Sequence, residues 1–482
     1  MGRFNNKDKK YDLKRVVVLP IVLVITAVLW LLPSSFFGIE GLSVVEQRMI
    51  AIFVFAALMW MFEVIPAWST SVIIIVIMLL TLSDSCFSFL NGTDKVANFG
   101  TLVSYKVLVS TYASPIIMLF LGGFVLAIAA SKVGLDVTLA KALLTPFGKN
   151  PKYVLLGFLM VIGFFSMFMS NTATAAMMLT FLTPVLKTLP AEGKGRIGLA
   201  LSIPIAANIG GIGTPIGTPP NAIALSYLNE HLNANVGFGE WMIVMVPFVV
   251  VMLLISWVLL LKLFPFKAKT IELVIEDKTE KNPHTYIVWI TFAATILLWV
   301  TDKLTGLNAN VVAMIPVGIF AVTGVIGKVD LQKINWSVLW MVAGGIALGV
   351  GLDKTGLASN LVKSIPFNEW MPIVVLLVSG LIGYLISNFI SNTASANLLV
   401  PILAAVAVGM GSNLDGLGGV RTLLIGVALS TSFAMLFPIS TPPNAIAHST
   451  GLITTKDMTK IGVIIGVVGY TLGYITLIFI GI

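Results

Sequence analysis

The sequence predicts an all-α polytopic membrane protein made of two inverted repeats, and three observations support this. Of its 482 residues, 57% are hydrophobic and only 10% are charged, a composition far outside the range of soluble proteins. Apolar segments close to the length that a membrane-crossing helix needs, about 20 residues, recur along the chain. Two polar motifs each occur twice at nearly constant spacing, which indicates an internal duplication.

We expect about eleven transmembrane helices, of which two are interrupted by glycine, threonine and a proline pair. The continuous segments lie at 15–33, 45–62, 66–83, 113–131, 241–264, 285–301, 309–327, 337–353 and 460–481, and the interrupted ones at 197–229 and 420–450. Two further segments, 152–189 and 371–410, carry a polar triplet between apolar flanks. We expect these to be re-entrant helical hairpins, with two extra crossings in each half as the alternative.

The duplicated motifs are polar and keep a regular register. Ser170-Asn171-Thr172 recurs 221 residues later as Ser391-Asn392-Thr393. Thr218-Pro219-Pro220-Asn221 recurs 223 residues later, beginning with Thr441-Pro442. A third match, Lys132-x-Gly134-Leu135 with Lys354-x-Gly356-Leu357, is offset by 222 residues. Polar side chains at membrane depth are costly unless they find partners, so the motifs predict one functional site that is built twice.

The chain divides into four predicted parts. These are an N-terminal segment with the first transmembrane helix (1–44), a first inverted repeat (45–264), a cytoplasmic linker (265–283) and a second inverted repeat (284–482). With a cytoplasmic N-terminus, the predicted inside loops hold 22 lysines and arginines against seven outside, as the positive-inside rule requires. The C-terminus is then outside, and the second half is inverted relative to the first, as in secondary transporters. We expect an integral protein of the plasma (inner) membrane, surrounded by lipid.

Other classes of function fit the sequence less well. The net charge of +8 does not indicate a nucleic-acid partner, because the lysines are scattered through loops between apolar segments and orient the chain instead. Cys86 is the only cysteine, which excludes an intramolecular disulfide and a cysteine-rich metal site. No Ser-His or Asp pair lies near either motif, so an intramembrane enzyme is disfavoured. A channel would lack the two gates that inverted broken helices imply.

The motif chemistry suits an anion beside a cation. Serine, threonine and asparagine offer hydrogen-bond donors, and the helix that follows a hairpin tip points its free N–H groups and positive end at the ligand. A proline pair opens a helix and frees carbonyl oxygens for a hard cation. No Arg, Lys, Asp or Glu lies in 166–186, 208–228, 387–405 or 432–450, so helix ends and a co-bound ion must neutralise the charge. Two like tips predict a small dicarboxylate, with a tetrahedral oxyanion such as sulfate as the alternative.

The paired Ser-Asn-Thr and Thr-Pro-Pro motifs resemble those of the divalent anion:sodium symporter family, over residues 45–482. The resemblance implies carriers of succinate, malate, fumarate, citrate and related dicarboxylates, an eleven-helix protomer with two re-entrant hairpins, a homodimer and an elevator movement. We therefore expect sodium-coupled symport of C4-type dicarboxylates such as succinate, malate, fumarate and 2-oxoglutarate. Sodium-independent exchange of dicarboxylates is the alternative. No cofactor is expected apart from sodium ions.

The resemblance also assigns residues by position. Substrate contacts fall on Asn171, Thr172, Asn392 and Thr393, with Ser170, Ser391, Thr218, Pro219, Thr441 and Pro442 beside them. The first sodium site resembles Ser166, Ser170, Asn171 and the Gly217 carbonyl, and the second resembles Ser387, Asn392 and the carbonyls of Ile390 and Ser440. Ser440 stands where the first half has Gly217, and we expect its side chain to alter the second site.

Overall fold

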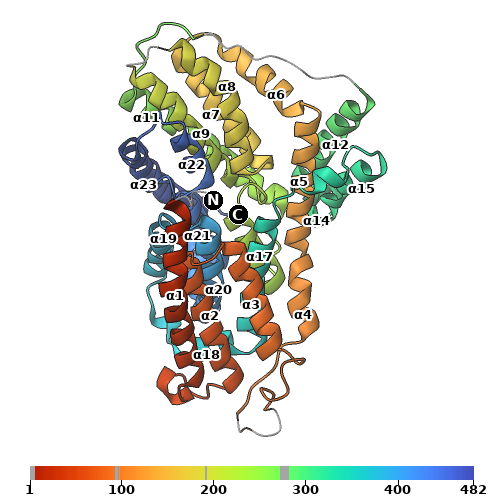
Figure 1. Cartoon of the computed structure of the whole chain (residues 1–482), viewed down its shortest axis with the longest axis vertical. Coiled ribbons are helices and arrows are strands. Elements are labelled where there is room, and N and C mark those ends of the chain that lie inside the picture. Colours follow the sequence, from red (N-terminus) through yellow and green to blue (C-terminus); the bar gives the residue numbers. More distant parts are fainter. Residues whose placement is uncertain (1–5, 93–95, 97, 190–192, 272–281) are drawn as a thin grey trace, which may run out of the picture.

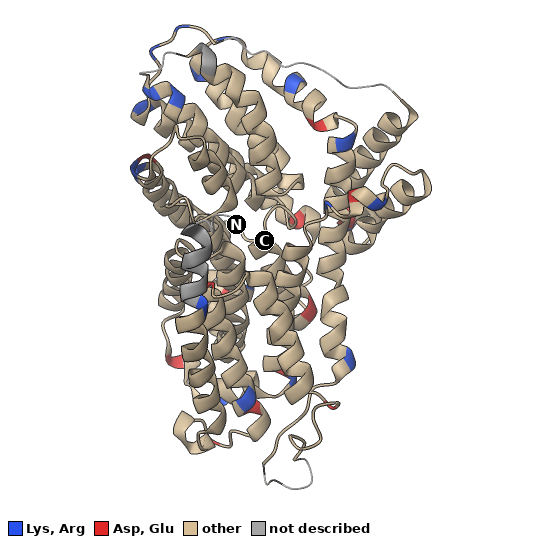
Figure 2. Ribbon diagram, in the orientation of Figure 1, with Lys and Arg blue, Asp and Glu red and all other residues tan. Residues whose placement is uncertain are grey.

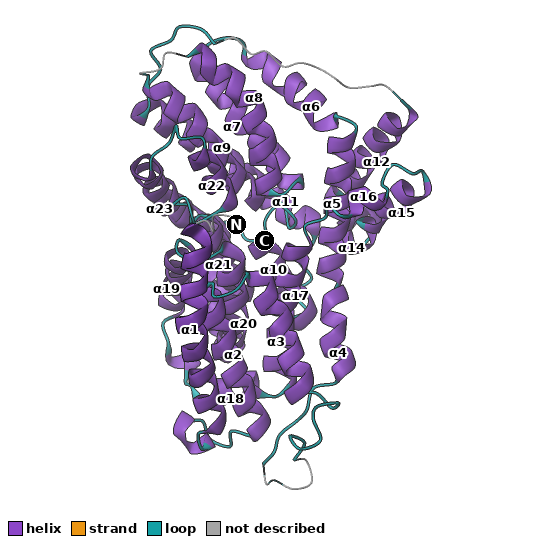
Figure 3. Ribbon diagram, in the orientation of Figure 1, coloured by secondary structure: helices purple, strands orange, loops and turns teal. Residues whose placement is uncertain are grey.

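The protein folds into helices throughout the part of the chain that can be described (Figure 3). A computed structural model of the chain describes residues 6–92, 96, 98–189, 193–271 and 282–482. Within these ranges the only β-type pairing is an isolated bridge between Ser83 and Val103. Nine of the described helices are long and apolar enough to cross a membrane, and shorter apolar helices accompany them. The all-α polytopic class is therefore confirmed, while the number of crossings stays a prediction.

In the first half of the chain, the first helix starts at Asn6, and its apolar part, Arg15–Leu31, lies within the predicted segment 15–33. The helices are α1 (Asn6–Leu31), α2 (Val44–Phe62), α3 (Ala67–Thr81), α4 (Tyr105–Ser110), α5 (Pro115–Lys132), α6 (Leu135–Leu144), α7 (Pro151–Phe168), α8 (Asn171–Thr188), α9 (Lys194–Gly210), α10 (Pro219–Ser226) and α11 (Phe238–Leu263). Residues 272–281 of the predicted linker lie outside the described residues.

The second half repeats this order of helices. It comprises α12 (Pro283–Val300), α13 (Asp302–Thr305), α14 (Ala309–Val312), α15 (Met314–Val322), α16 (Lys328–Leu331), α17 (Trp336–Lys354), α18 (Leu357–Ser364), α19 (Pro372–Ser387), α20 (Asn392–Met410), α21 (Gly419–Ser432), α22 (Pro442–Ser449) and α23 (Thr455–Phe479). In place of the predicted span 309–327, the structure has two short helices, α14 and α15. The second ends at Val322, shortly before Gly324, whose φ of 69° is left-handed.

The Lys-x-Gly-Leu repeat marks equivalent corners in the two halves. Gly134 precedes α6 with φ of 71°, and Gly356 precedes α18 with φ of 88°. Both values lie in the left-handed region, where glycine is favoured because it has no Cβ. In Figure 1, α6 lies at the upper end of the molecule and α18 at the lower end. Equivalent elements therefore sit at opposite ends, as an inverted repeat requires.

Close glycine contacts interlock the two halves. A Cβ added to Gly122 of α5 would lie 2.1 Å from the carbonyl oxygen of Ala313, between α14 and α15. At the matching place, a Cβ added to Gly344 of α17 would lie 2.4 Å from Cβ of Ser71 in α3. Small residues let membrane helices approach this closely. Each half therefore packs a central helix against the early helices of the other half.

Charged residues gather in turns and at helix ends (Figure 2).

Candidate functional site

Each Ser-Asn-Thr triplet lies at a break between two helices, as the sequence predicts. Ser170 is the N-cap of α8, and its hydroxyl accepts a hydrogen bond from the backbone N–H of Ala173 at 3.2 Å. Ser391 caps α20 in the same way, through the N–H of Ala394 at 3.2 Å. A serine in extended conformation is a favoured N-cap, so the triplet itself sets the point at which each helix begins. The re-entry of the hairpins into the membrane stays a prediction.

The two interrupted helices are also observed, and asparagines hold their loops open. The chain unwinds between α9 and α10 and between α21 and α22. Asn221 and Asn444, the last residues of the Thr-Pro-Pro-Asn motifs, donate to carbonyl oxygens of these loops. Asn221 Nδ2 contacts Gly211 and Thr214 at 3.1 and 2.9 Å, and Asn444 Nδ2 contacts Met435 and Phe437 at 2.9 Å each. The only sequence signal for this role is that an asparagine ends the Thr-Pro-Pro-Asn motif in both halves.

The four breaks meet at one cavity of about 180 Å³. All ten residues assigned to the substrate line it: Ser170, Asn171, Thr172, Thr218, Pro219, Ser391, Asn392, Thr393, Thr441 and Pro442. Residues outside the motifs complete the wall, and sequence reasoning missed them: Phe120 and Phe124 of α5, Asn208 of α9, and Asn335, Val338 and Met341 in or just before α17. None of the described residues lining this cavity carries a charge.

Four helix N-termini supply positive potential in place of charged side chains. The residues that precede α8, α10, α20 and α22 all line the cavity: Ser170, Thr218, Ser391 and Thr441. Each helix N-terminus is equivalent to roughly half a positive charge, so four amount to about two. Both α10 and α22 start with two prolines, which lack N–H groups. Backbone donors for an anion therefore come from α8 and α20.

In the first half, oxygen atoms surround the amide of Asn171. This amide lies 2.6 Å from Ser166 Oγ, 3.0 Å from the Gly217 carbonyl oxygen and 3.2 Å from the Ala207 carbonyl oxygen. Ser166 is fully buried and donates to Ala207 at 2.7 Å. With Nδ2 turned inward, the amide donates to these oxygens. With Oδ1 turned inward, four oxygens converge, and oxygen atoms are the ligands that a hard cation prefers.

Three of the four predicted ligands of the first sodium site are therefore close together. The fourth, Ser170, has its hydroxyl engaged in the cap of α8. The Ala207 carbonyl was missed, because a backbone oxygen leaves no trace in side-chain identity.

The second half has a matching cluster. Ser387 is fully buried, and its Oγ lies 2.8 Å from Asn392 Oδ1 and 3.0 Å from the Thr431 carbonyl oxygen. Thr431 thus takes the place of Ala207. Ile390 is buried in the break before Ser391. The Ser440 hydroxyl donates to the Asn388 carbonyl at 2.9 Å, so the side chain absent from Gly217 ties this loop to the hairpin.

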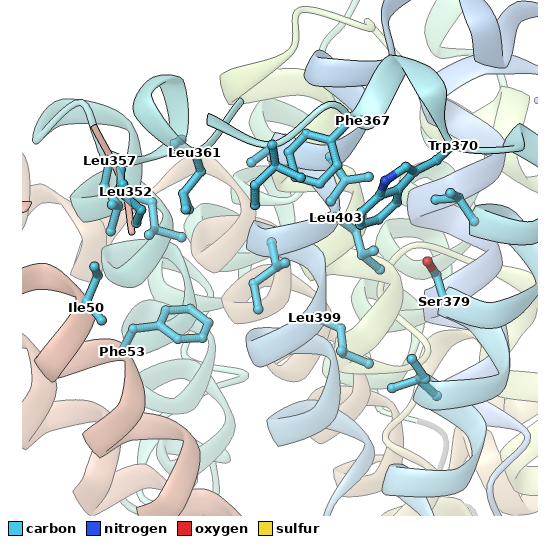
Figure 4. Close-up of a pocket in the computed structure, with 18 of the residues that line it drawn as sticks. Ile50, Phe53, Leu352, Leu357, Leu361, Phe367, Trp370, Ser379, Leu399 and Leu403 are labelled. Atoms are coloured by element: carbon cyan, nitrogen blue, oxygen red, sulfur yellow. The ribbon is translucent and has the colours of Figure 1, made fainter. Parts of the chain in front are cut away.

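A larger cavity, of about 730 Å³, has the wrong chemistry for a dianion (Figure 4). It is formed mainly by α2, α18, α19 and α20. Its wall is apolar except for the Ser379 hydroxyl and the Trp370 indole. Burying a carboxylate among such side chains would leave it without partners. The cavity at the four breaks is therefore the candidate site.

Comparisons with known proteins agree with this architecture. The family described as the sodium:sulfate symporter transmembrane region matches residues 13–481. Among similar proteins are the sodium-dependent dicarboxylate transporters SdcS of Staphylococcus aureus strains USA300, NCTC 8325 and COL. Each is 29% identical over 480 residues, covering 92% of this chain and 87% of the relative. The resemblance to the divalent anion:sodium symporters is thereby confirmed: the chain belongs to the sodium:sulfate symporter family and is a membrane transporter, not an enzyme.

Proposed function

We propose that this protein carries C4-type dicarboxylates, such as succinate, malate and fumarate, and the related five-carbon 2-oxoglutarate, together with sodium ions. The observation that carries the proposal is the convergence of both Ser-Asn-Thr triplets on one cavity whose described lining has no charged side chain. Four helix N-termini supply about two positive charges there, which matches a dianion. The name of the SdcS relatives supports the same substrate class.

The two ends of the substrate would bind at the two hairpin tips. One carboxylate accepts hydrogen bonds at Asn171 and Thr172, and the other at Asn392 and Thr393, since all four residues line the cavity. Sulfate, which the family description mentions, has all its charge on one centre. It would satisfy one tip and leave the donors of the other without a partner, at a cost of about 1–3 kcal/mol. The duplicated tips therefore favour a two-ended ligand.

Sodium would couple to the substrate through the Asn171 amide. When a cation lies among Ser166 Oγ and the carbonyls of Ala207 and Gly217, Oδ1 turns toward it and Nδ2 is free to face the carboxylate. Without the cation, Nδ2 donates to those oxygens, and Oδ1 faces the carboxylate and repels it. Asn392 differs, because its Oδ1 already faces the Ser387 hydroxyl, so a cation at the second cluster would meet this oxygen without a rotation of the amide. Sodium binding then raises substrate affinity with no cationic side chain.

The cavity wall also favours an elevator movement. The polar triplets and caps come from the hairpins and broken helices, whereas α5 contributes Phe120 and Phe124 and α17 contributes Val338 and Met341. Asn335, just before α17, is a polar residue in this otherwise apolar wall, and the hairpins could slide past the wall while keeping most hydrogen bonds to the ligand. We propose that they do so within a homodimer in the plasma membrane, with the N-terminus in the cytoplasm and the C-terminus outside.

Uptake into proteoliposomes tests the proposal. We expect labelled succinate to enter empty vesicles under an inward sodium gradient, and its apparent affinity to rise with sodium concentration. Uptake that ignores sodium but requires dicarboxylate inside the vesicle would replace symport with exchange and leave the cavity assignment intact. Uptake of sulfate without any dicarboxylate would overturn the substrate class.

A further inference from the structure

A second cavity adjoins the candidate site and is lined by positive charge. It has a volume of about 260 Å³ and shares Phe124, Ser170 and Asn335 with the central cavity. Its only charged lining residues, among those described, are Lys132 and Lys333. Lys132 is the last residue of α5, and Lys333 precedes α17 by three residues. The lysines and the hairpin tip at Ser170 therefore border one cavity, which shares part of its wall with the central one.

One buried carboxylate holds both lysines in place. Lys132 Nζ donates to Asp330 Oδ2 at 2.6 Å and to the Val325 carbonyl at 2.7 Å, and Lys333 Nζ lies 3.0 Å from Asp330 Oδ1. The side chain of Asp330 is 6% exposed, whereas those of Lys132 and Lys333 are 42% and 57% exposed. Hydrogen bonds from Lys132, from the Gly327 N–H and from Lys333 hold the pKa of Asp330 well below its usual range, so this anchor stays ionised.

Two carboxylates, those of Asp136 and Asp330, are hydrogen-bonded to residues that line this cavity. Asp136 is buried and accepts hydrogen bonds from the Ser131 hydroxyl at 2.7 Å and from the Val137 N–H at 2.8 Å. Neither Asp136 nor Asp330 lines the cavity. Each ammonium group has three N–H donors, and Asp330 and Val325 use only two of those on Lys132 and one on Lys333. The remaining donors are available to an anion.

We propose that Lys132 and Lys333 form an anion vestibule, a second binding place for the dicarboxylate between solution and the central cavity. The inference rests on the proposed function. A lysine ammonium is a strongly hydrated point charge, so the vestibule attracts a dianion but holds it loosely enough to pass it on to the helix N-termini. The loops that carry both lysines are on the predicted cytoplasmic side, and the vestibule serves that side alone.

Neutralising Lys333 is the cleanest test, because Lys132 and Asp330 can still pair. We expect Lys333→Gln to raise KM for substrate presented from the vestibule side by roughly three- to tenfold at low ionic strength. This is the range for a dianion and a unit charge about 6–13 Å apart in a watery medium. The effect should shrink as choline chloride is added at constant sodium, because salt screens the attraction. Lys333→Glu should raise KM further. Lys333→Arg, which keeps the positive charge, should leave KM close to that of the unmodified protein.

The measurement uses right-side-out and inverted membrane vesicles, with initial rates of labelled succinate transport. Lys328→Gln is the matched control, since Lys328 is exposed in the same loop and does not line the vestibule. A KM increase confined to one side, with the maximal rate unchanged, supports the vestibule. Equal KM values for Lys333→Gln and Lys328→Gln, or equal increases from both sides, overturn it. If the unmodified protein carries no dicarboxylate at all, the proposed function fails instead.

Discussion

The two halves of the site use the same parts but are braced differently. Asn208 follows the Ala207 carbonyl, and its Nδ2 crosses to the other half, donating to Thr441 Oγ1 at 3.1 Å and to Asn444 Oδ1 at 3.2 Å. The residue after Thr431 is Ser432, whose hydroxyl donates only to the Ala428 carbonyl of its own helix. The first half therefore holds the loop that precedes α22 in the second half, whereas Ser432 makes no equivalent contact to the first half.

The loops before the Thr-Pro-Pro motifs differ in a complementary way. A Cβ added to Gly217 would lie 2.3 Å from the Gly211 carbonyl oxygen, so this turn accepts only glycine. Its counterpart Ser440 has a side chain, and it bonds the hairpin at Asn388. The duplication therefore preserved the motif residues that line the cavity, whereas the contacts that support them diverged. We therefore expect equal effects from changes at the triplets and unequal effects from changes at the supports.

The largest effects are expected at the triplet asparagines. Asn171→Ala and Asn392→Ala should each reduce dicarboxylate affinity by roughly ten- to a hundredfold, since a lost charged hydrogen bond costs about 1–3 kcal/mol. Succinate uptake by reconstituted protein measures this, with Asn310→Ala, outside the cavity lining, as the control. Parental transport by either triplet variant would refute the two-tip arrangement.

Gly217→Ser should have the second-largest effect. It places in the first half the serine that the second half has at Ser440. The added Cβ clashes with the Gly211 carbonyl, and overpacking of this kind costs about 1–3 kcal/mol. We expect a lower melting temperature in detergent and a weaker response of uptake to sodium. Gly318→Ser is the control, because an added Cβ there meets nothing within 4 Å. A Gly217→Ser protein as stable and sodium-responsive as this control would show that the turn is not constrained.

Asn208→Ser removes the cross-brace and makes the first half resemble the second. Two hydrogen bonds disappear, and the expected loss is about 1–2 kcal/mol. Thermal unfolding with and without succinate should show a lower melting temperature in both conditions. Ser432→Ala, which breaks only a bond within one helix, should change it less. If the two variants are equally stable, the brace between the halves contributes nothing.

Ser440→Gly should have the smallest effect on transport. It removes the hydrogen bonds that the Ser440 hydroxyl donates to the Asn388 carbonyl and accepts from the Phe437 N–H, worth about 1 kcal/mol each, and leaves the cluster at Ser387 and Asn392 in place. We expect transport to continue with a modest shift in its sodium dependence. A loss as large as that of Gly217→Ser would mean that the two turns are equally critical, contrary to the comparison above.

Much of the fold and of the candidate site could be predicted from local sequence. Ser170 and Ser391 begin helices at the positions predicted, because capping depends on a few adjacent residues. The predicted substrate residues share one cavity, because the duplication implied a single site. The predicted span at 309–327 was too long, since hydropathy does not register the left-handed turn at Gly324. The binding roles of these residues stay predictions.

By itself, the sequence determined that this chain lies in a membrane as helices, that it is duplicated, and that the segments around its polar motifs carry no charged side chain. These properties depend on composition and on short segments. Only the tertiary structure decided which backbone oxygens join Ser166 and Ser387, that Asn208 reaches Thr441, and that Asp330 holds Lys132. The backbone oxygens could not be identified from the sequence, because every residue has the same carbonyl group. The contact between Asn208 and Thr441 joins positions 233 residues apart, and that between Lys132 and Asp330 joins positions 198 residues apart. Such pairs have no signature in either segment alone, because they exist only once the helices have packed.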